Sequence, residues 1–234
     1  MAISSRPDIV KIVMSHACTD EMPGPVLRRL PRYLTHVREL NKVDQEWVSS
    51  REIAQTLGLT MSTVRQDISH LDLVGVSKRG YEVSKLERVL SETLGAGSIH
   101  QTVIVGAGLL GRALALHADF EESGFVTCAI FDAAPHIVGT SVGPLVVKPM
   151  GELDSIVREI NVDIGVIAVP ANAAQSVADQ LVGAGILGIL NLAHSHLHVP
   201  KHVYIVEARI IARMQEIAYA IRTGKTFAAK SASS

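Results

Sequence analysis

The sequence predicts an α/β protein in which a small, mainly helical domain precedes a doubly wound, mainly parallel sheet. Three observations support this fold class. A helix-turn-helix pattern with capping residues at both helix starts lies in residues 49–71. A G-x-G-x-x-G motif follows an apolar strand and opens a helix at residues 106–111. From residue 101 to residue 222, apolar strands alternate with helical patterns, as in a parallel sheet covered on both faces.

Length and composition fit a globular protein of two small domains. The chain has 234 residues and is 47% hydrophobic, enough for two cores. It lacks an apolar run of the roughly 20 residues that span a bilayer, and residues 1–21 lack the apolar core of a signal peptide. The two cysteines, Cys18 and Cys128, have no metal-ligand spacing. We expect a cytoplasmic protein with no membrane partner and no metal.

The amino-terminal part is predicted to be a flexible arm followed by a helix. Residues 1–22 are polar and unpatterned, and the Pro and Gly residues at 23–25 prevent a helix there. A helix with one apolar face is predicted from Val26, with Pro31 in its first turns. The apolar positions of this helix are Leu27, Leu30, Tyr33, Leu34, Val37 and Leu40.

The next segment has the pattern of a helix-turn-helix. Ser49 and Glu52 have the spacing of a capping box, Gly58 supplies the turn, and Thr60 can cap the second helix. Val64 and Ile68 give the second helix a core face. An ordinary helical hairpin is the alternative. The caps, the turn glycine, the small residue Ala54 and the mildly basic surroundings together favour DNA binding, since residues 24–88 have 11 basic against 8 acidic side chains.

Candidate DNA contacts follow from this interpretation. Arg65 and Gln66 lie away from the core face of the second helix, where Arg pairs well with guanine and Gln with adenine. Residues 75–83 read as a short hairpin, or wing, whose tip residues Lys78 and Arg79 could reach phosphates. The candidate DNA-binding residues are Arg28, Arg29, Ser49, Ser50, Thr60, Ser62, Thr63, Arg65, Gln66, His70, Lys78 and Arg79.

The G-x-G-x-x-G motif predicts a dinucleotide site. Gly106 allows a tight turn, Gly108 lets the backbone approach a pyrophosphate, and Gly111 lets the helix pack closely on the strand. A second apolar strand ends in Asp132, 21 residues past Gly111, where such folds place the acid that binds the ribose hydroxyls. A carboxylate there favours NAD(H) over NADP(H). The candidate cofactor-binding residues are Gly106, Ala107, Gly108, Leu109, Leu110, Gly111, Asp132, Ala168, Val169, Pro170 and Asn191.

The remaining elements complete a Rossmann-type domain. Strands are predicted at 101–105, 125–131, 145–148, 163–169, 186–192 and 203–206, and helices at 109–122, 152–160, 172–183 and 208–222. The last helix has an apolar stripe that belongs either to the core of its own chain or to a contact with a partner subunit. His194, His196 and His198 alternate, and we interpret them as loop residues near the ligand pocket rather than a metal site.

These motifs together closely resemble the Rex family of redox-sensing transcriptional repressors. The likeness covers about residues 23–222 and rests on segments such as 28–34, 64–67, 106–114, 168–171 and 188–191. It implies a winged-helix domain at 23–95, a Rossmann NAD(H)-binding domain at 96–207, and a swapped dimerisation helix with a tail at 208–234. It also implies a homodimer that binds a palindromic operator and is released by NADH, with NADH and NAD⁺ as regulatory ligands.

This chain departs from the family pattern at two positions of a switch network. The family usually has a Tyr where this chain has His117, and an Asp where it has Glu207. In the family those two residues and an Arg of the first helix form a state-dependent network between domains and subunits. The resemblance therefore implies a switch network of His117, Glu207 and Arg29. Because His, unlike Tyr, gains a proton near neutral pH, we expect the switch to depend on pH.

The predicted function is a transcriptional repressor that senses the NADH/NAD⁺ ratio, and not an enzyme. About 135 residues remain for the Rossmann half, which leaves no room for a separate catalytic domain. Two alternatives remain open: a Rossmann-fold enzyme with a helical attachment, and a CoA- or nucleotide-binding module.

Overall fold

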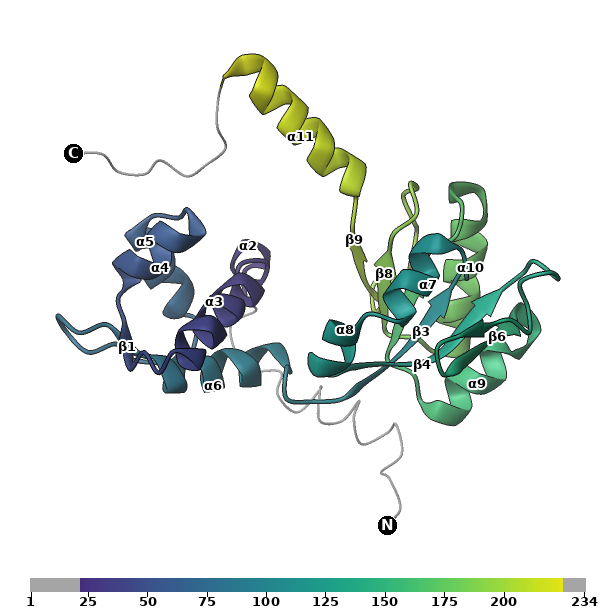
Figure 1. The fold of residues 1–234 in the computed structure, drawn as a ribbon, viewed down its shortest axis with the longest axis horizontal. Helices are drawn as coiled ribbons and strands as arrows, with labels where there is room; N and C mark the ends of the chain where they lie inside the picture. Colours follow the sequence, from purple (N-terminus) through teal and green to yellow (C-terminus); the bar gives the residue numbers. More distant parts are fainter. Residues whose placement is uncertain (1–21, 225–234) are drawn as a thin grey trace, which may run out of the picture. The chain divides into compact units, whose positions relative to one another are not determined.

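The computed structural model describes residues 22–224, which form two compact units divided between Leu94 and Gly95 (Figure 1). Almost all of the expected arm at 1–22, and the tail beyond Gly224, lie outside the described residues. Within the described range, every helix is too short or too polar to cross a membrane.

The first unit is a small helical domain with a two-stranded sheet. Its core lies where α3 packs along α6, and it includes the fully buried Leu30, Val64, Ile68 and Leu86. Its elements are α2 (Gly24–Leu27), α3 (Leu30–Lys42), β1 (Trp47–Val48), α4 (Ser50–Leu57), α5 (Met61–Ile68), β2 (Tyr81–Glu82) and α6 (Val83–Leu94).

The helix expected from Val26 already begins at Gly24 and is then interrupted. The Pro and Gly residues at 23–25 therefore do not prevent a helix there, because Pro25 lies in the first turn, where its missing N–H is tolerated. α2 ends at Leu27, and α3 restarts at Leu30 with Pro31 in its first turn. Pro31 has no N–H to donate, and its ring would collide with the carbonyl of Leu27 in a continuous helix, so the chain has to restart there. As a result Leu27 is 48% exposed, and its predicted place on the apolar face is wrong.

The helix-turn-helix follows its sequence signals closely. Ser49 and Glu52 form the reciprocal capping box, and the hydrogen bonds from Ser49 lower the pKa of Glu52. Gly58 ends α4 in the left-handed conformation, and the Thr60 hydroxyl caps α5. The wing is a short hairpin as predicted, reduced to one antiparallel bridge between Val76 and Gly80. Its turn closes through paired hydrogen bonds between Val76 and Gly80, and β2 then pairs with β1.

The second unit is a seven-stranded sheet in the order β5-β6-β4-β3-β7-β8-β9, parallel except at β5. Its strands are β3 (His100–Val105), β4 (Phe125–Asp132), β5 (Ser141–Val142), β6 (Leu145–Pro149), β7 (Ile164–Ile167), β8 (Gly188–Asn191) and β9 (Tyr204–Glu207). Its helices are α7 (Leu109–Ala115), α8 (Ala118–Glu122), η1 (Met150–Glu152), α9 (Leu153–Ile160), α10 (Ala171–Ala184) and α11 (Ile210–Thr223). Without β5, this is the doubly wound order whose direction reverses between β3 and β7.

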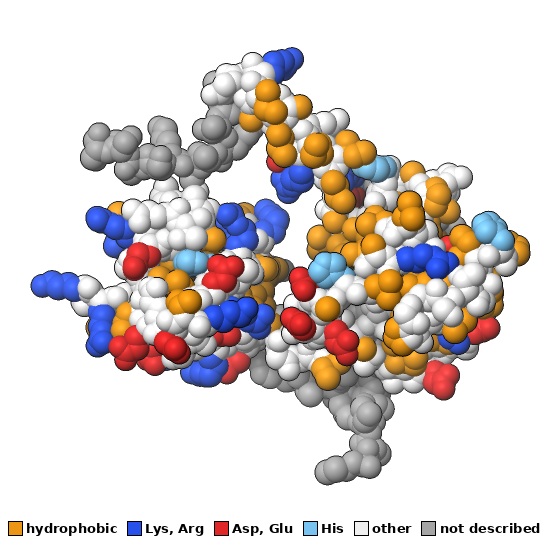
Figure 2. Space-filling view, in the orientation of Figure 1, with side chains coloured by type: hydrophobic (Ala, Val, Ile, Leu, Met, Phe, Trp, Pro, Cys, Tyr) orange, Lys and Arg blue, Asp and Glu red, His pale blue; other side chains and the backbone are white. Residues whose placement is uncertain are grey.

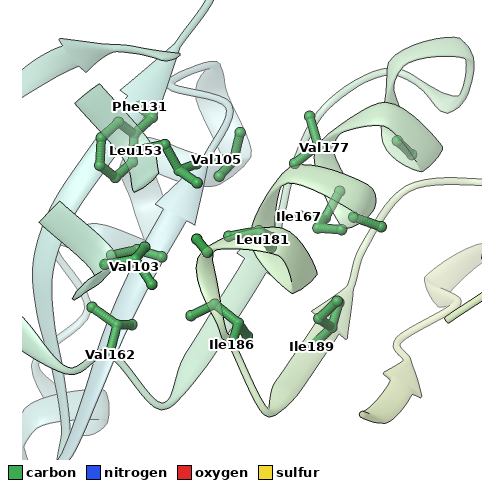
Figure 3. Close-up of a cluster of buried hydrophobic side chains, with 14 of the residues drawn as sticks. Val103, Val105, Phe131, Leu153, Val162, Ile167, Val177, Leu181, Ile186 and Ile189 are labelled. Atoms are coloured by element: carbon green, nitrogen blue, oxygen red, sulfur yellow. The ribbon is translucent and has the colours of Figure 1, made fainter. Parts of the chain in front are cut away.

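The sheet is buried on both faces because its strands are apolar at successive positions. Val103 and Val105 of β3 pack with Leu181 of α10 on one face, in the cluster shown in Figure 3. Ile104 lies between them in the strand and points to the other face of the sheet. There it belongs to a second buried cluster, which includes Ala107. The alternation of strand side chains therefore gives both faces an apolar surface for helices to cover. Because β3, β4 and β7 are parallel, their carboxyl ends lie at one edge of the sheet.

Residues 109–122 form two helices rather than the single one predicted. α7 ends at Ala115 with Leu116 as its C-cap, and His117 has an extended backbone before α8 begins. Asp119 and Glu121 lie in the first turn of α8, where carboxylates favour a helix N-terminus. α8 then packs against β4.

The apolar stripe of α11 is not core in the described chain. No residue of α11 is buried, and Ile210, Met214 and Ile217 are 62%, 60% and 53% exposed. Figure 2 shows hydrophobic side chains gathered along this helix. An exposed apolar stripe of this kind marks an interaction surface.

Candidate nucleotide site and DNA-binding surface

The glycine-rich turn lies at the reversal point of the sheet. Gly106 follows β3 with φ +105°, and a side chain there would collide with the carbonyl oxygen of Ala168 after β7. A side chain at Gly111 would overlap the carbonyl of Gly106. Gly108 differs, because a Cβ atom added to it would have no atom within 4 Å. Gly106 and Gly111 are therefore required by packing, whereas Gly108 leaves open space for a ligand.

Asp132 is bound to this turn. Its Oδ2 atom accepts a hydrogen bond of 2.7 Å from the N–H of Ala107, and its Oδ1 accepts one of 2.8 Å from the N–H of Ala134. The end of β4 and the glycine-rich turn are thus one hydrogen-bonded unit.

A cleft of about 360 Å³ opens beside this unit. Six of the predicted cofactor residues line it: Gly106, Gly108, Asp132, Ala168, Val169 and Pro170. Ala107 and Gly111 are buried behind it, while Leu109 and Leu110 are exposed on the first turn of α7. A cleft with open backbone at Gly108 and a carboxylate at Asp132 has the chemistry to hold a dinucleotide.

Asn191 occupies a different environment from the one predicted. It is buried, its amide donates to the carbonyl of Ser195 at 2.9 Å, and its Oδ1 accepts from the N–H of Ala193 at 2.9 Å. Asn191 does not line the cleft. It shapes the loop after β8.

Arg112 is a residue of this region that sequence reasoning did not single out. Its Nε donates to the carbonyl of Ala107 at 2.7 Å, and one Nη donates to the Thr140 hydroxyl at 2.6 Å. It therefore joins the glycine-rich turn to the segment before β5. Its position directly after Gly111 was the only available signal.

In the helical domain, α5 is the second helix of the helix-turn-helix, and we call it the recognition helix. Arg29 holds this helix to α3. Its guanidinium donates two hydrogen bonds of 2.6 Å to Asp67, whose side chain is 2% exposed. Asp67 also accepts from the hydroxyl of Tyr33. The hydrogen bond with Asp67 raises the pKa of Arg29, and burial raises that of Tyr33. Arg29 is thus already engaged as an anchor, and either predicted role, in DNA contact or in the switch, would compete with this pair.

The other candidate DNA contacts divide into exposed and engaged residues. Arg28, Ser62, Gln66, His70 and Lys78 are exposed. Ser49, Thr60 and Thr63 take part in the helix caps, and buried Ser50 accepts a hydrogen bond from Arg65. Arg79 lies 4.1 Å above the Trp47 ring and 3.6 Å from Glu46.

The predicted switch residues have partners within their own chain. Glu207 contacts Arg209 at 2.6 Å and His196 at 2.7 Å. His117 is 54% exposed and lies 3.8 Å from Asp119. His196 and His198 meet edge to face, and the described residues contain no group of three ligands suited to a metal ion.

A winged helix-turn-helix joined to a Rossmann domain with an open glycine-rich turn defines a class of protein: a DNA-binding regulator with a nucleotide-binding domain. Residues 21–69 match the family model "Putative DNA-binding protein N-terminus", and residues 98–195 match the CoA binding domain. The chain is 36% identical to the redox-sensing transcriptional repressor Rex of Clostridium botulinum (strain Eklund 17B / Type B), over 83% of this chain and 92% of that protein. It belongs to the Rex family of redox-sensing transcriptional repressors.

Solved structures of RSP, a Rex-family repressor, agree with this assignment. The complex of RSP with β-NADH has a TM-score of 0.80, covering 88% of this chain and 97% of that one. The complex with β-NAD⁺ and operator DNA has a TM-score of 0.83, covering 88% and 95%. Both are 33% identical to this chain. The family is one of repressors rather than enzymes.

Proposed function

We propose that this protein is a transcriptional repressor that senses the NADH/NAD⁺ ratio, binds a palindromic operator as a homodimer, and leaves it when NADH binds. The observation that carries the proposal is the cleft at the reversal point of the sheet. Open space at Gly108 suits a pyrophosphate, and the Asp132 carboxylate suits the ribose hydroxyls while repelling a 2′-phosphate. The solved complexes of RSP with NADH, and with NAD⁺ and operator DNA, support the same ligands here. Such a repressor would act in the cytoplasm.

The dimer follows from α11. Its apolar stripe has no partner among the described residues of its own subunit, so a second copy is the natural cover. Two-fold symmetry would place two copies of α5 on successive major-groove faces, which requires a palindromic site.

One experiment tests the proposal. The purified protein selects duplexes from a library with a randomised centre, and binding to the selected duplex is measured across NADH/NAD⁺ ratios at fixed salt. We expect a high NADH fraction to release the duplex and NAD⁺ to permit binding. A duplex affinity independent of this ratio would overturn the proposal.

Because residues 98–195 match a CoA binding domain, CoA is the competing candidate ligand. The same assay can test it. CoA should neither release the duplex nor displace NADH from the protein. Displacement of NADH by equimolar CoA would favour a CoA-binding module instead.

A further inference from the structure

A second cleft lies in the helical domain, between the start of α4, the recognition helix α5 and the wing. Its volume is about 790 Å³. Arg51, Arg65 and Lys78 line it together with Ser50 and Tyr81, and no acidic residue does. A cleft lined only by basic and neutral groups attracts an anion.

The position of Arg65 along α5 determines which side of the helix its side chain lies on. Val64 and Ile68 are fully buried, so Ser62 and Gln66 lie on the opposite face of the helix. Arg65 lies on the flank between these faces, on the side of α4. Its Nε donates to the hydroxyl of buried Ser50 at 3.1 Å, which holds the guanidinium in the cleft rather than on the face that Gln66 occupies.

Arg65 has no ion-pair partner in the part of the chain that the structure describes, so its charge is free for a ligand. Its other guanidinium nitrogens are not used by the contact with Ser50. Tyr81 lines the same cleft as Arg65, and burial raises the pKa of its phenol while the charge of Arg65 opposes this rise.

The wing presents one of its two basic residues to this cleft. Lys78 lines it and has a left-handed backbone with φ +64° at the tip of the turn. Arg79 is instead occupied by Trp47 and Glu46. The turn is closely packed, because side chains at Gly75 and Gly80 would collide with the Tyr81 ring and the Val48 carbonyl.

We propose that this cleft seats the DNA sugar-phosphate backbone, with Arg65 and Lys78 as its phosphate ligands, and that base readout on α5 falls to Ser62 and Gln66. Phosphate contacts carry no sequence information, whereas contacts from the outward face of a recognition helix do. The proposal rests on the DNA binding of the proposed function and adds a division of roles to it. The sequence alone predicts Arg65 as a base reader, whereas its contact with Ser50 places it in this cleft.

The test compares Arg65→Ala, Arg65→Lys and Gln66→Ala over a salt series. The probes are the duplex selected by the wild-type protein and a scrambled duplex of the same length. Arg65→Ala should weaken both duplexes alike and reduce the slope of log K against log salt by about 0.9, the value for one phosphate. Lys78→Ala should do the same. Arg65→Lys should keep the slope, because a point charge still binds a phosphate.

Gln66→Ala should leave the slope unchanged and reduce the ratio of the two affinities. Arg88→Ala is the matched control, because it removes an equal charge from α6, where Arg88 pairs with Glu92. Its slope should stay at the wild-type value. Thermal unfolding of each variant checks the fold.

An Arg65→Ala variant that lost preference for the selected duplex while keeping the wild-type slope would overturn the assignment. So would an Arg65→Lys variant that lost that preference. Failure of the proposed function has a different signature, namely wild-type binding that ignores sequence and NADH. The slopes of Arg65→Ala and Arg88→Ala would still decide the phosphate role in that case.

Discussion

The carboxylate of Asp132 accepts a hydrogen bond of 2.7 Å from the backbone N–H of Ala107, so the end of β4 is tied to the glycine-rich turn after β3. Its second oxygen accepts from the N–H of Ala134. A carboxylate has about four lone-pair sites, so both oxygens can also accept from ribose hydroxyls. Asp132 thus shapes the turn, and in the proposed site its charge would select the ligand.

Replacing Asp132 with Ala should weaken NADH binding and reduce discrimination against NADPH. Charge-assisted hydrogen bonds contribute about 1.5–3 kcal/mol, so we expect a loss of about ten- to hundredfold in NADH affinity. Calorimetric titration with NADH and NADPH measures both effects. Asp132→Asn is the intermediate variant, because it keeps one acceptor oxygen, which can still bind the N–H of Ala107, and loses the charge and the second acceptor. Equal NADH affinity in wild type and Asp132→Ala would remove Asp132 from the site.

Substitutions at two glycines of the turn should have different effects, one on NADH binding and the other on stability. Gly108 has φ −73°, which Ala adopts readily, and its Cβ position is empty, so Gly108→Ala should fold with an unchanged Tm and lose NADH binding. Gly111→Ala should instead lower stability by about 1–3 kcal/mol or more, because its methyl group overlaps the carbonyl of Gly106. Thermal unfolding and NADH titration of both variants test this. A Gly108→Ala variant with wild-type affinity would contradict the site.

The structural features that were predicted correctly depend on local sequence signals. The capping box of Ser49 and Glu52, the turn at Gly58 and the position of Asp132 at a strand end all depend on neighbours within a few residues. The doubly wound, mainly parallel sheet follows from the alternation of strands and helices, although the short antiparallel strand β5 was not predicted. These features could therefore be derived before the fold was known.

The features that could not be predicted from the sequence mostly depend on residues that are distant in the chain. Asp67 reads as a polar residue of an exposed helix, yet it is buried because Arg29 and Tyr33 reach it from more than 30 residues away. Arg79 reads as a free wing charge, but Trp47 lies beneath it. The break at His117 has no Pro or Gly to announce it.

The pair of Arg29 and Asp67 should govern the stability of the helical domain. Removing one partner of a buried ion pair costs about 3–5 kcal/mol, and because Arg29 is 26% exposed we expect about 2–3 kcal/mol for Arg29→Ala. Urea unfolding measures this loss. Arg28→Ala is the neighbouring control, and it should leave stability unchanged while weakening DNA binding. Wild-type stability in Arg29→Ala would show that the pair is dispensable.

Dimerisation should depend on α11. Met214→Lys with Ile217→Lys should give a monomer whose Rossmann domain stays folded, because neither side chain is buried in its own subunit. Deleting residues 208–234 should have the same effect. Sedimentation velocity distinguishes the two states, and Gln215→Lys, on the same exposed helix, is the control for added charge. A double variant that still sediments as a dimer would contradict this prediction.

The release of DNA by NADH should depend on pH between about 6 and 8, where a His can gain a proton and a Tyr cannot. If His117 meets Glu207 and Arg29 in only one functional state, the two states bind different numbers of protons, and the equilibrium between them then depends on pH by linkage. Glu207 would first have to exchange its contacts with Arg209 and His196. NADH titrations of the DNA complex at about pH 6, 7 and 8 measure the effect, and His117→Tyr should flatten it.

Two control variants identify the group responsible for that pH dependence. His202→Tyr changes an exposed histidine outside the network and should keep the wild-type pH profile. His196→Gln removes the other imidazole that contacts Glu207, and it should weaken the hold on Glu207 without abolishing the pH dependence. A profile that survives in His117→Tyr but disappears in His196→Gln would assign the proton to His196. Identical profiles in all four proteins would mean that NADH acts through domain closure alone, without the network of His117 and Glu207.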